Sequence, residues 1–341
     1  MKKIVGITMG DPAGIGPEIA IKALNKQALY DRCQPLLIGD KSVLLYYLEK
    51  HPELDLAINV VKTPSEGTFT FGTIDLIDLA IVRMEDLPIG EVSKVGGNAA
   101  FQYVKKVIEL AMANEIDATV TNPLNKEAMN AAGHHYAGHT EIYADLTGTE
   151  KYTMMLADGN LRVVHVSTHV SLREACDRAT KERVLDVIRI ADQACKNLGI
   201  AEPRIAVAGL NPHCGENGLF GQEEIKEINP AVAAAQAKGI KAYGSLPADT
   251  VFSKANGGMY DIVVAMYHDQ GHIPLKTLGF VYDQKSGAWE AVKGVNITLG
   301  LPIIRTSVDH GTAFDQAGKW TASEFSLENA IDYAIRLAEN S

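Results

Sequence analysis

The sequence lacks the features that mark membrane and secreted proteins. Its 341 residues contain no apolar stretch near the roughly 20 residues that a transmembrane helix needs. Met1–Gly6 is charged at its start and has no small-residue cleavage site, which is typical of a first strand and not of a signal peptide. The chain has neither an internal repeat nor a low-complexity tract. We therefore expect a soluble protein of the cytoplasm.

Cysteine and clustered basic charge are also scarce. The four cysteines are widely spaced and form no C-x-x-C pair, which is typical of reduced thiols in a cytosolic protein. The formal net charge is −10, and the lysines and arginines are scattered along the chain. Nucleic acid or an anionic membrane would favour a basic stripe instead. We therefore expect neither as a partner.

Hydrophobic residues make up 46% of the chain, which is enough for a large core. Short runs rich in Val and Ile alternate with helical patterns, which predicts an α/β fold with a largely parallel sheet buried on both faces. The expected strands are Lys3–Met9, Pro35–Gly39, Ala118–Thr121, Val163–Thr168, Arg204–Leu210, Asp261–Tyr267 and Val295–Leu299. The expected helices include Pro17–Leu24, Asn98–Ala113, Lys181–Leu198, Gln222–Lys238 and Ser326–Glu339. The polar stretch Tyr282–Lys293 predicts a surface excursion or a hairpin.

Three of the expected strands run into a histidine. His169, His213 and His268 follow the carboxyl ends of their strands, where ligands bind in open α/β sheets. Each alone is more simply explained as a capping or hydrogen-bonding residue, but three equivalent positions favour a metal site with room for substrate. By ligand type, zinc, nickel, iron or cobalt suits three imidazoles better than magnesium. Asp269 and Glu216 are candidates to orient His268 and His213, and equally good candidates for surface carboxylates.

The segment Gly10–Glu18 joins the first expected strand to the first expected helix. Its glycines permit tight turns, and N–H groups at a helix start can hold an anion. It is neither G-x-G-x-x-G nor a Walker A loop. An ordinary strand-to-helix turn explains it as well, so the segment predicts no particular cofactor.

Other polar residues are candidate substrate contacts. His139 and Thr140 begin an expected helix and could hold a phosphate or carboxylate, with N-capping by Thr140 as the alternative. Lys276 and Arg305 could pair with an anionic substrate, although each alone is more often a surface charge. Asn296 lies inside an apolar strand, where a buried amide needs partners.

Several of these stretches resemble the 4-hydroxythreonine-4-phosphate dehydrogenase family, in order from residue 7 to about residue 315. They are Ile7-Thr-Met-Gly-Asp-Pro-Ala-Gly-Ile-Gly-Pro-Glu18, Gly138-His-Thr-Glu141, Ser167-Thr-His169, Leu210-Asn-Pro-His213, Leu246-Pro-Ala-Asp-Thr250, Tyr267-His-Asp-Gln-Gly271 and Gly294-Val-Asn-Ile-Thr-Leu-Gly-Leu-Pro302. Gly271-His-Ile-Pro-Leu-Lys276, Asn122-Pro-Leu-Asn-Lys-Glu127 and Gly215-Glu-Asn-Gly-Leu-Phe220 resemble its branch of D-threonate or D-erythronate 4-phosphate dehydrogenases.

The resemblance implies a two-domain fold like that of isocitrate and isopropylmalate dehydrogenases, with a cleft between the domains. We expect one domain of residues 1–125 with 275–341 and a second of residues 126–274. The resemblance also implies a homodimer with its active site at the subunit interface. It implies NAD as cofactor, bound without the Rossmann fingerprint, so no NAD-binding residue is assigned.

The resemblance further assigns the site residues. It places a divalent metal on His169, His213 and His268, and leaves zinc, magnesium, cobalt, nickel and manganese open. The substrate contacts it implies are His139, Thr140, Lys276, Asn296 and Arg305.

The implied reaction is oxidation at C3 of a four-carbon hydroxy acid 4-phosphate, followed by decarboxylation. The metal would acidify the C3 hydroxyl, and Asp249 or Lys276 would accept its proton. D-Threonate or D-erythronate 4-phosphate would give dihydroxyacetone phosphate. The alternatives are the 4-hydroxythreonine-4-phosphate dehydrogenase of pyridoxal phosphate biosynthesis, a phosphate-handling acyltransferase and a non-catalytic sugar-acid binding protein. The residues do not show whether a hydroxyl or an amine is recognised at C2.

Overall fold

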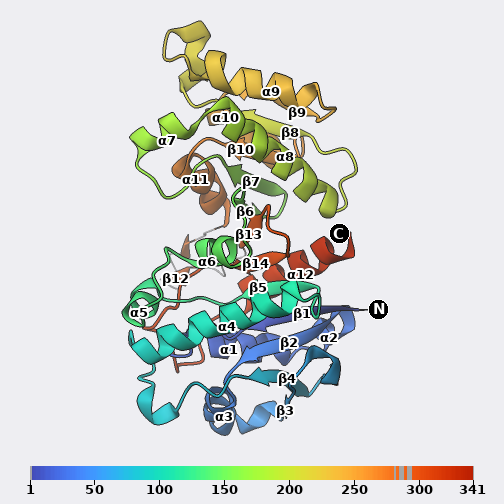
Figure 1. Ribbon diagram of the computed structural model, residues 1–341, viewed down its shortest axis with the longest axis vertical. Helices are drawn as coiled ribbons and strands as arrows, with labels where there is room; N and C mark the ends of the chain where they lie inside the picture. The colour runs from blue at the N-terminus through green and yellow to red at the C-terminus, as the bar shows by residue number, and fades with distance from the viewer. Residues whose placement is uncertain (1, 280–281, 284–287, 290–293, 341) are drawn as a thin grey trace. The chain divides into compact units, whose positions relative to one another are not determined.

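The computed structural model describes residues 2–279, 282–283, 288–289 and 294–340. The chain divides into two compact units (Figure 1), the first formed by Met1–Glu150 with Leu301–Glu339 and the second by Lys151–Gly300 with Asn340–Ser341. Strands and helices alternate in both units, so the α/β prediction is confirmed. No helix among the described residues combines the length and the apolar character that crossing a membrane requires.

The sheet of the first unit consists of parallel strands in the order β3-β4-β2-β1-β5-β14. The strands are β1 (Lys3–Thr8), β2 (Cys33–Gly39), β3 (Ala57–Val60), β4 (Thr73–Asp78), β5 (Ala118–Thr121) and β14 (Arg305–Val308). All residues of β5 and β14 are buried. Such complete burial is expected for parallel strands that helices cover on both faces.

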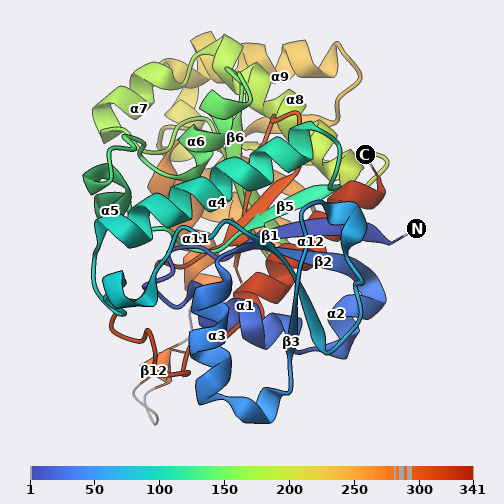
Figure 2. The same ribbon diagram turned by 60° about the horizontal axis from the view of Figure 1, so that its bottom comes forward.

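Helices cover both faces of this sheet. α4 packs on β1, β2 and β5, whereas α12 packs on β1, β5 and β14, and Figure 2 shows α4 in front of the strands and α12 behind them. The helical elements are α1 (Gly16–Leu24), α2 (Gln27–Arg32), α3 (Lys41–Lys50), α4 (Lys94–Met112), α5 (Lys126–Ala131), α6 (His139–Leu146) and α12 (Phe325–Glu339), with 3₁₀ turns η1 (Pro52–Leu54), η2 (Pro64–Glu66) and η3 (Met84–Asp86). α4 begins at Ser93, whose Oγ accepts a hydrogen bond from the N–H of Gly96 at 3.1 Å.

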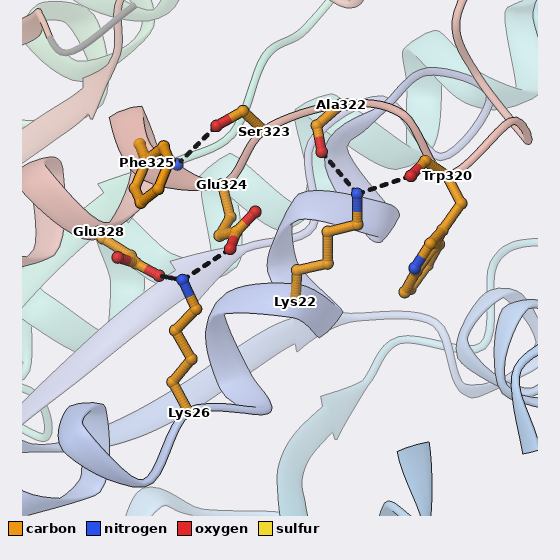
Figure 3. Close-up of polar contacts among 8 residues, drawn as sticks. All are labelled: Lys22, Lys26, Trp320, Ala322, Ser323, Glu324, Phe325 and Glu328. Carbon is orange, nitrogen blue, oxygen red and sulfur yellow. Dashed lines mark hydrogen bonds and ion pairs between the residues drawn. The ribbon is translucent and has the colours of Figure 1, made fainter. Parts of the chain in front are cut away.

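The C-terminal part of the chain is fastened to α1 by two lysines (Figure 3). Lys22 Nζ donates to the carbonyl oxygens of Trp320 at 2.8 Å and Ala322 at 2.6 Å. Lys26 forms ion pairs with Glu324 and Glu328. These contacts join residues about 300 positions apart in the sequence and hold α12 on the first unit.

The sheet of the second unit is mixed, with the strand order β13-β6-β7-β10-β8-β9. β7, β10, β8 and β9 run parallel to one another, whereas β6 is antiparallel to both β7 and β13. The strands are β6 (Thr153–Asp158), β7 (Leu161–His165), β8 (Ile205–Ala208), β9 (Ala242–Leu246), β10 (Ile262–Ala265) and β13 (Val295–Leu299).

Helices also cover both faces of the second sheet. Val163, Ala206 and Val263 point toward α10 and α11 and form a buried cluster with them. Because side chains alternate along a strand, their neighbours Val164 and Val264 point to the opposite face, where they are buried on the α8 side. The helical elements are α7 (Leu172–Arg178), α8 (Lys181–Asn197), α9 (Asn229–Gln236), α10 (Ala248–Asn256) and α11 (His268–Gly279), with a 3₁₀-type segment η4 (Pro212–Gly218) and a π-helical turn η5 (Glu224–Ile228).

The expected strands all occur, and among the described residues five strands occur that we had not expected, namely β3, β4, β6, β9 and β14. β3 and β9 end the two strand orders and are only partly buried, so they lack the continuous apolar run that marks a central strand. The expected helix Gln222–Lys238 is formed by η5 and α9 in direct succession, so it starts with a π-helical turn. Within the polar stretch 282–293, the described pieces β11 (Tyr282–Asp283) and β12 (Ala288–Trp289) pair antiparallel. The remainder of that stretch lies outside the described residues.

The boundaries between the two units lie at 150/151 and 300/301. They differ from 125/126 and 274/275, where we had placed them. Helix α5 packs on α4 so closely that a side chain at Gly97 would overlap the backbone of Ala128, which keeps the chain after residue 125 in the first unit. β13 pairs with β6 from Val295↔Ala157 to Leu299↔Thr153, which keeps the chain before residue 300 in the second. The cleft expected between two domains stays a prediction.

Candidate metal and substrate site

The three histidines of the predicted metal site follow three neighbouring strands of the second unit. β10 lies between β7 and β8 and is parallel to both. His169 follows β7, His268 follows β10 and His213 follows β8. The carboxyl ends of parallel strands meet at one edge of a sheet, so the three histidines stand at the same edge.

His169 and His268 lie closest together. Their ring centroids are 5.8 Å apart, and both side chains line a cavity of about 470 Å³ together with Ser171, Tyr267 and Asp269. His268 Nδ1 is 2.6 Å from Asp269 Oδ1. With the Nδ1 proton donated to this carboxylate, the lone pair of His268 is on Nε2, the tautomer that is typical of metal-bound histidine held by a carboxylate.

This pair fits a divalent metal. An imidazole nitrogen binds zinc at about 2.1 Å, which places the ring centroids of two ligands on one ion about 5–6 Å apart, and the observed separation is 5.8 Å. Among the residues that the structure describes, however, no group of three or more His, Cys, Asp or Glu side chains is gathered closely enough to hold a metal. His213 is exposed at the opposite side of β10 from His169. The structure therefore brings together two of the three predicted ligands.

Two further histidines, which we had not predicted, pack beside His268. The His272 ring is stacked on it at a centroid distance of 3.6 Å, and His272 Nδ1 lies 2.9 Å from the His268 carbonyl oxygen. His165 lies behind His272 at 4.8 Å. Burial lowers the pKa of His272 to about 4 and that of His165 to about 3, so both rings are neutral near pH 7 and add no charge beside a bound cation. The spacing of four residues on a helix between His268 and His272 was the signal that could have found the stack.

The two candidates for the proton acceptor lie on different helices of the second unit. Asp249 is in the first turn of α10 and lines a cavity of about 500 Å³, which it shares with Asp269. Asp269 also lines the cavity at His169 and His268, whereas Asp249 lines only the first of the two cavities. Lys276 is exposed in the last turn of α11, two helical turns beyond His268. The structure leaves both residues as candidates.

Asn296 lies in β13, as expected, and is half-buried. Its Nδ2 donates to the Met154 sulfur at 3.0 Å across the pairing with β6. A thioether is a weak acceptor.

The remaining substrate candidates belong to the first unit. Arg305 begins β14, is 2% exposed, and donates to Thr121 Oγ1 at 2.9 Å. Its guanidinium lies 5.6 Å from the Tyr143 ring centroid, and burial lowers its pKa to about 10. It therefore stays charged at neutral pH. A buried guanidinium with five donors suits a carboxylate or phosphate.

His139 and Thr140 are the first two residues of α6, and His139 lies within reach of the charge of Arg305. Gly138 occupies the N-cap position and no side chain caps the helix, so the capping role considered for Thr140 is wrong. The His139 Nε2 atom is buried and has no hydrogen-bond partner among the residues that the structure describes. Burial, reinforced by the charge of Arg305, holds the pKa of His139 well below its usual range. The three side chains thus offer one cation and neutral donors in one corner of the first unit.

The segment Gly10–Glu18 forms a tightly packed turn between β1 and α1. Asp11 N–H donates to the Pro123 carbonyl at 2.8 Å, and Ile15 N–H donates to the Thr312 carbonyl at 3.0 Å. A side chain at Gly14 would approach that carbonyl oxygen to 2.8 Å. These contacts account for the glycines of the segment through packing.

The comparisons with known proteins agree with the sequence motifs. The family described as "PdxA: Pyridoxal phosphate biosynthetic protein PdxA" matches residues 31–334. Two relatives carry the provisional name D-threonate 4-phosphate dehydrogenase. The relative from Symbiobacterium thermophilum is 49% identical over 337 residues, which are 99% of this chain and 97% of the relative. The relative from Oceanobacillus iheyensis is 52% identical over 339 residues, which are 99% and 98% of the two chains.

A solved structure gives the same result. The crystal structure of 4-hydroxythreonine-4-phosphate dehydrogenase from Klebsiella pneumoniae superposes with a TM-score of 0.86 at 46% identity, covering 98% of this chain and 99% of that one. The family match spans most of the chain, and relatives near half identity extend along nearly all of it. This chain therefore belongs to the PdxA family of pyridoxal phosphate biosynthetic proteins.

Proposed function

We propose that this chain is an NAD-dependent and metal-dependent dehydrogenase that oxidises C3 of D-threonate 4-phosphate, or of D-erythronate 4-phosphate, and releases CO2. The main support for a metal-dependent reaction is the position of three histidines at one edge of the second sheet. His169, His213 and His268 follow three adjacent parallel strands there. The names of the two relatives near 50% identity support the substrate.

The side chains of the second unit would handle the reacting hydroxyl. A divalent metal on the three histidines would supply Lewis acidity that makes the C3 hydroxyl easier to deprotonate. Asp269 fixes the tautomer of His268 through its 2.6 Å contact. Asp249, which lines the adjoining cavity, or Lys276 accepts the hydroxyl proton.

The chemistry balances with NAD as the oxidant. The C3 hydrogen leaves as hydride to NAD⁺ and the hydroxyl proton goes to the base, which gives a β-keto acid and NADH. The C1–C2 bond then breaks, CO2 leaves, and C2 takes up a proton. D-Threonate 4-phosphate and D-erythronate 4-phosphate both give dihydroxyacetone phosphate.

Arg305, His139 and Thr140 would bind the substrate's anionic groups. The buried guanidinium offers several parallel donors to a phosphate or carboxylate. The neutral His139 and the Thr140 hydroxyl add hydrogen bonds without further charge. Lys276 and Asn296 complete the proposed set of contacts.

We also propose that the chain acts as a homodimer. Leu172, Ile273 and Leu278 are 63%, 62% and 50% exposed and line the two cavities beside the histidine pair. Large exposed apolar side chains beside a site are typical of a surface that a partner covers. Light scattering after size exclusion would test this, and a monomeric mass at micromolar concentration would contradict it.

The alternative is the 4-hydroxythreonine-4-phosphate dehydrogenase reaction, because the solved structure at 46% identity carries that name. The test is NADH formation from both substrates, with metal content measured on the same sample. We expect a kcat/KM at least about 10-fold higher for D-threonate 4-phosphate, since a site rejects a substrate that leaves its polar groups unpaired. A preference for the amino substrate would favour the alternative. Turnover of neither would overturn the proposal.

A further inference from the structure

His213 begins a strained segment of backbone. Residues 213–217 have φ values of 51°, 55°, 77°, 45° and 55°, a run in the left-handed region in which only Gly215 is a glycine. L-residues visit this region singly and at an energetic cost. A run of five persists only where the surroundings hold it, and such segments concentrate at functional sites. We name residues 213–217 the left-handed turn.

A single buried carboxylate, that of Glu224, holds the chain immediately before this turn. Its Oε1 accepts the backbone N–H groups of Leu210 at 2.8 Å and Asn211 at 2.7 Å, and its Oε2 accepts Asn211 Nδ2 at 2.9 Å. Glu224 is 1% exposed. Hydrogen bonds from N–H groups to a buried carboxylate are among the strong ones in proteins, so Glu224 fixes the two residues that lead to Pro212 and His213.

The same carboxylate packs against the left-handed turn itself. A side chain at Gly215 would approach Glu224 Oε2 to 2.9 Å, and one at Gly209 would approach Oε1 to 3.2 Å. The chain therefore wraps around this carboxylate both before and after His213. The π-helical turn η5, which Glu224 begins, places the carboxylate at this point of the fold.

The segment that Glu224 holds before His213 is also connected to α11, the helix that begins with His268. Gln270, nearly buried on α11, donates from Nε2 to the Gly209 carbonyl at 2.7 Å and accepts the Met266 N–H on Oε1 at 2.7 Å. The backbone before His213 and the backbone before His268 thus share one buried amide. A displacement of the Glu224 clamp would move His213 relative to His268.

We infer that Glu224 is a positioning residue for His213, which it sets as a metal ligand by fixing the left-handed turn. This inference rests on the proposed function, because it assumes that His213 binds the metal. The sequence had suggested Glu216 for this role, but the Glu216 side chain is exposed. Glu224, eleven residues after His213 in the sequence, makes the contacts instead.

The test compares Glu224→Gln with Glu216→Gln in the metal-stripped full-length protein, titrated with Co²⁺. Glutamine keeps the size of the side chain but turns one acceptor oxygen into a donor that opposes Asn211 Nδ2. We expect Glu224→Gln to weaken Co²⁺ binding about 10–100-fold, as is usual for groups that orient metal ligands, and to change the visible spectrum of bound Co²⁺. Glu216→Gln should leave the dissociation constant within about twofold and the spectrum unchanged.

Two further measurements separate positioning from folding and from the proposed function. If Glu224→Gln lowers the urea midpoint but leaves the Co²⁺ dissociation constant and spectrum unchanged, Glu224 is only structural and the inference fails alone. If His213→Ala binds Co²⁺ as the wild type does, the proposed triad fails and the inference falls with it. Should Glu224→Gln not fold, Glu224→Asp provides the test, because it retains the charge one carbon short of the two N–H groups. Weakened Co²⁺ binding supports the inference, and unchanged binding overturns it.

Discussion

The two units expose their candidate functional groups very differently. In the first unit Arg305 is 2% exposed and His139 Nε2 is buried. These two groups, which would bind the substrate's anions, are therefore shielded from solvent. In the second unit the His268 side chain is 38% exposed and His213 is exposed as well. Of the residues that hold these histidines in place, Glu224 and Gln270 are buried, whereas Asp269 is exposed.

This difference follows from where each group stands relative to its sheet. The Arg305 side chain starts on β14 and reaches Thr121 at the end of the parallel neighbour β5, so strand packing itself holds it. The histidines stand beyond the ends of β7, β8 and β10, with His213 in η4 and His268 at the start of α11. The chain that leads to these positions is held by side chains such as Glu224 and Gln270. We conclude that substitution of Arg305 in the first unit should affect substrate affinity, whereas substitution of the histidines in the second should affect metal retention.

The largest expected effect is the removal of a metal ligand from the second unit. His268→Ala should lower kcat/KM for NADH formation about 1,000-fold or more and reduce bound metal, because the ion both binds and activates the reacting hydroxyl. Initial rates and metal analysis of the purified protein are the measurements. His135→Ala, an exposed histidine of the first unit, is the matched control and should change neither. Retention of metal and rate in His268→Ala would contradict the proposed triad.

The next effect concerns the buried cation of the first unit. Arg305→Lys should raise the KM for the phosphorylated substrate about 10–100-fold, because a charged hydrogen bond contributes about 1.5–3 kcal/mol and an ammonium lacks the guanidinium fork. Bound metal should not change. The control is Arg183→Lys in the second unit, where Arg183 donates to the carbonyl oxygens of Val166 and Tyr152. A larger KM change in Arg183→Lys than in Arg305→Lys would break the division of roles between the units.

The sequence pattern indicates the candidate metal site because its main signal is local. An apolar run that ends in histidine is visible in a single stretch, and parallel pairing then gathers such ends at one edge. Strands β5 and β13 occur within the expected limits for the same reason. The class of fold and the candidate ligands could therefore be predicted.

The residues that hold the candidate ligands in place, Glu224 and Gln270, could not be predicted. Their partners are distant in the sequence, and their own sequence surroundings look like those of an ordinary helix. Glu224 contacts Asn211 from 13 residues away, and it lies in a π-helical turn where the pattern indicates an unbroken helix. Gln270 reaches Gly209 across 61 residues. The positive φ of His213 leaves no signal in the sequence either, because histidine adopts the left-handed region more often than most residues but still in a minority of cases.

A third prediction tests packing in the two units with glycine substitutions. Gly97→Ala in the first unit would force Cβ into the backbone of Ala128, and should reduce the free energy of unfolding by about 2–3 kcal/mol. Gly271→Ala in the second unit would meet the His165 and Val163 side chains, which can shift more easily than backbone, so about 1 kcal/mol is expected. Urea denaturation measures both. The control is Gly257→Ala, where Cβ would meet only ordinary contacts beyond 3.4 Å.

The outcome of these glycine substitutions is specific to each unit. Gly97→Ala should leave metal affinity unchanged, whereas Gly271→Ala should weaken it, because His165 packs on the His272 ring that stacks on His268. Equal metal affinity in both variants would show that the histidine stack does not influence the pair.

The smallest expected effect is a pH dependence that originates in the first unit. Burial raises the pKa of Asp11 to about 6, above its value in the unfolded chain, so the folded state holds this proton more tightly. The stability that Asp11 contributes is therefore complete below about pH 4 and is lost as the pH rises to about 6. The shift corresponds to at most about 3 kcal/mol, and relaxation around a buried charge reduces it, so we expect about 1–2 kcal/mol.

Asp11→Asn removes this titration while keeping an oxygen that can accept the Ala13 N–H, now at 3.0 Å. The difference in unfolding free energy between Asp11→Asn and wild type should grow in favour of the variant from pH 4 to pH 6 and stay constant above it. Asp31→Asn, an exposed carboxylate of the same unit, should run parallel to wild type throughout. The second unit has the opposite trend, because burial lowers the pKa of His165 to about 3 and acid removes its contribution below about pH 6.5. A pH-independent difference for Asp11→Asn would show that the carboxyl of Asp11 is not held protonated by the packing of the first unit.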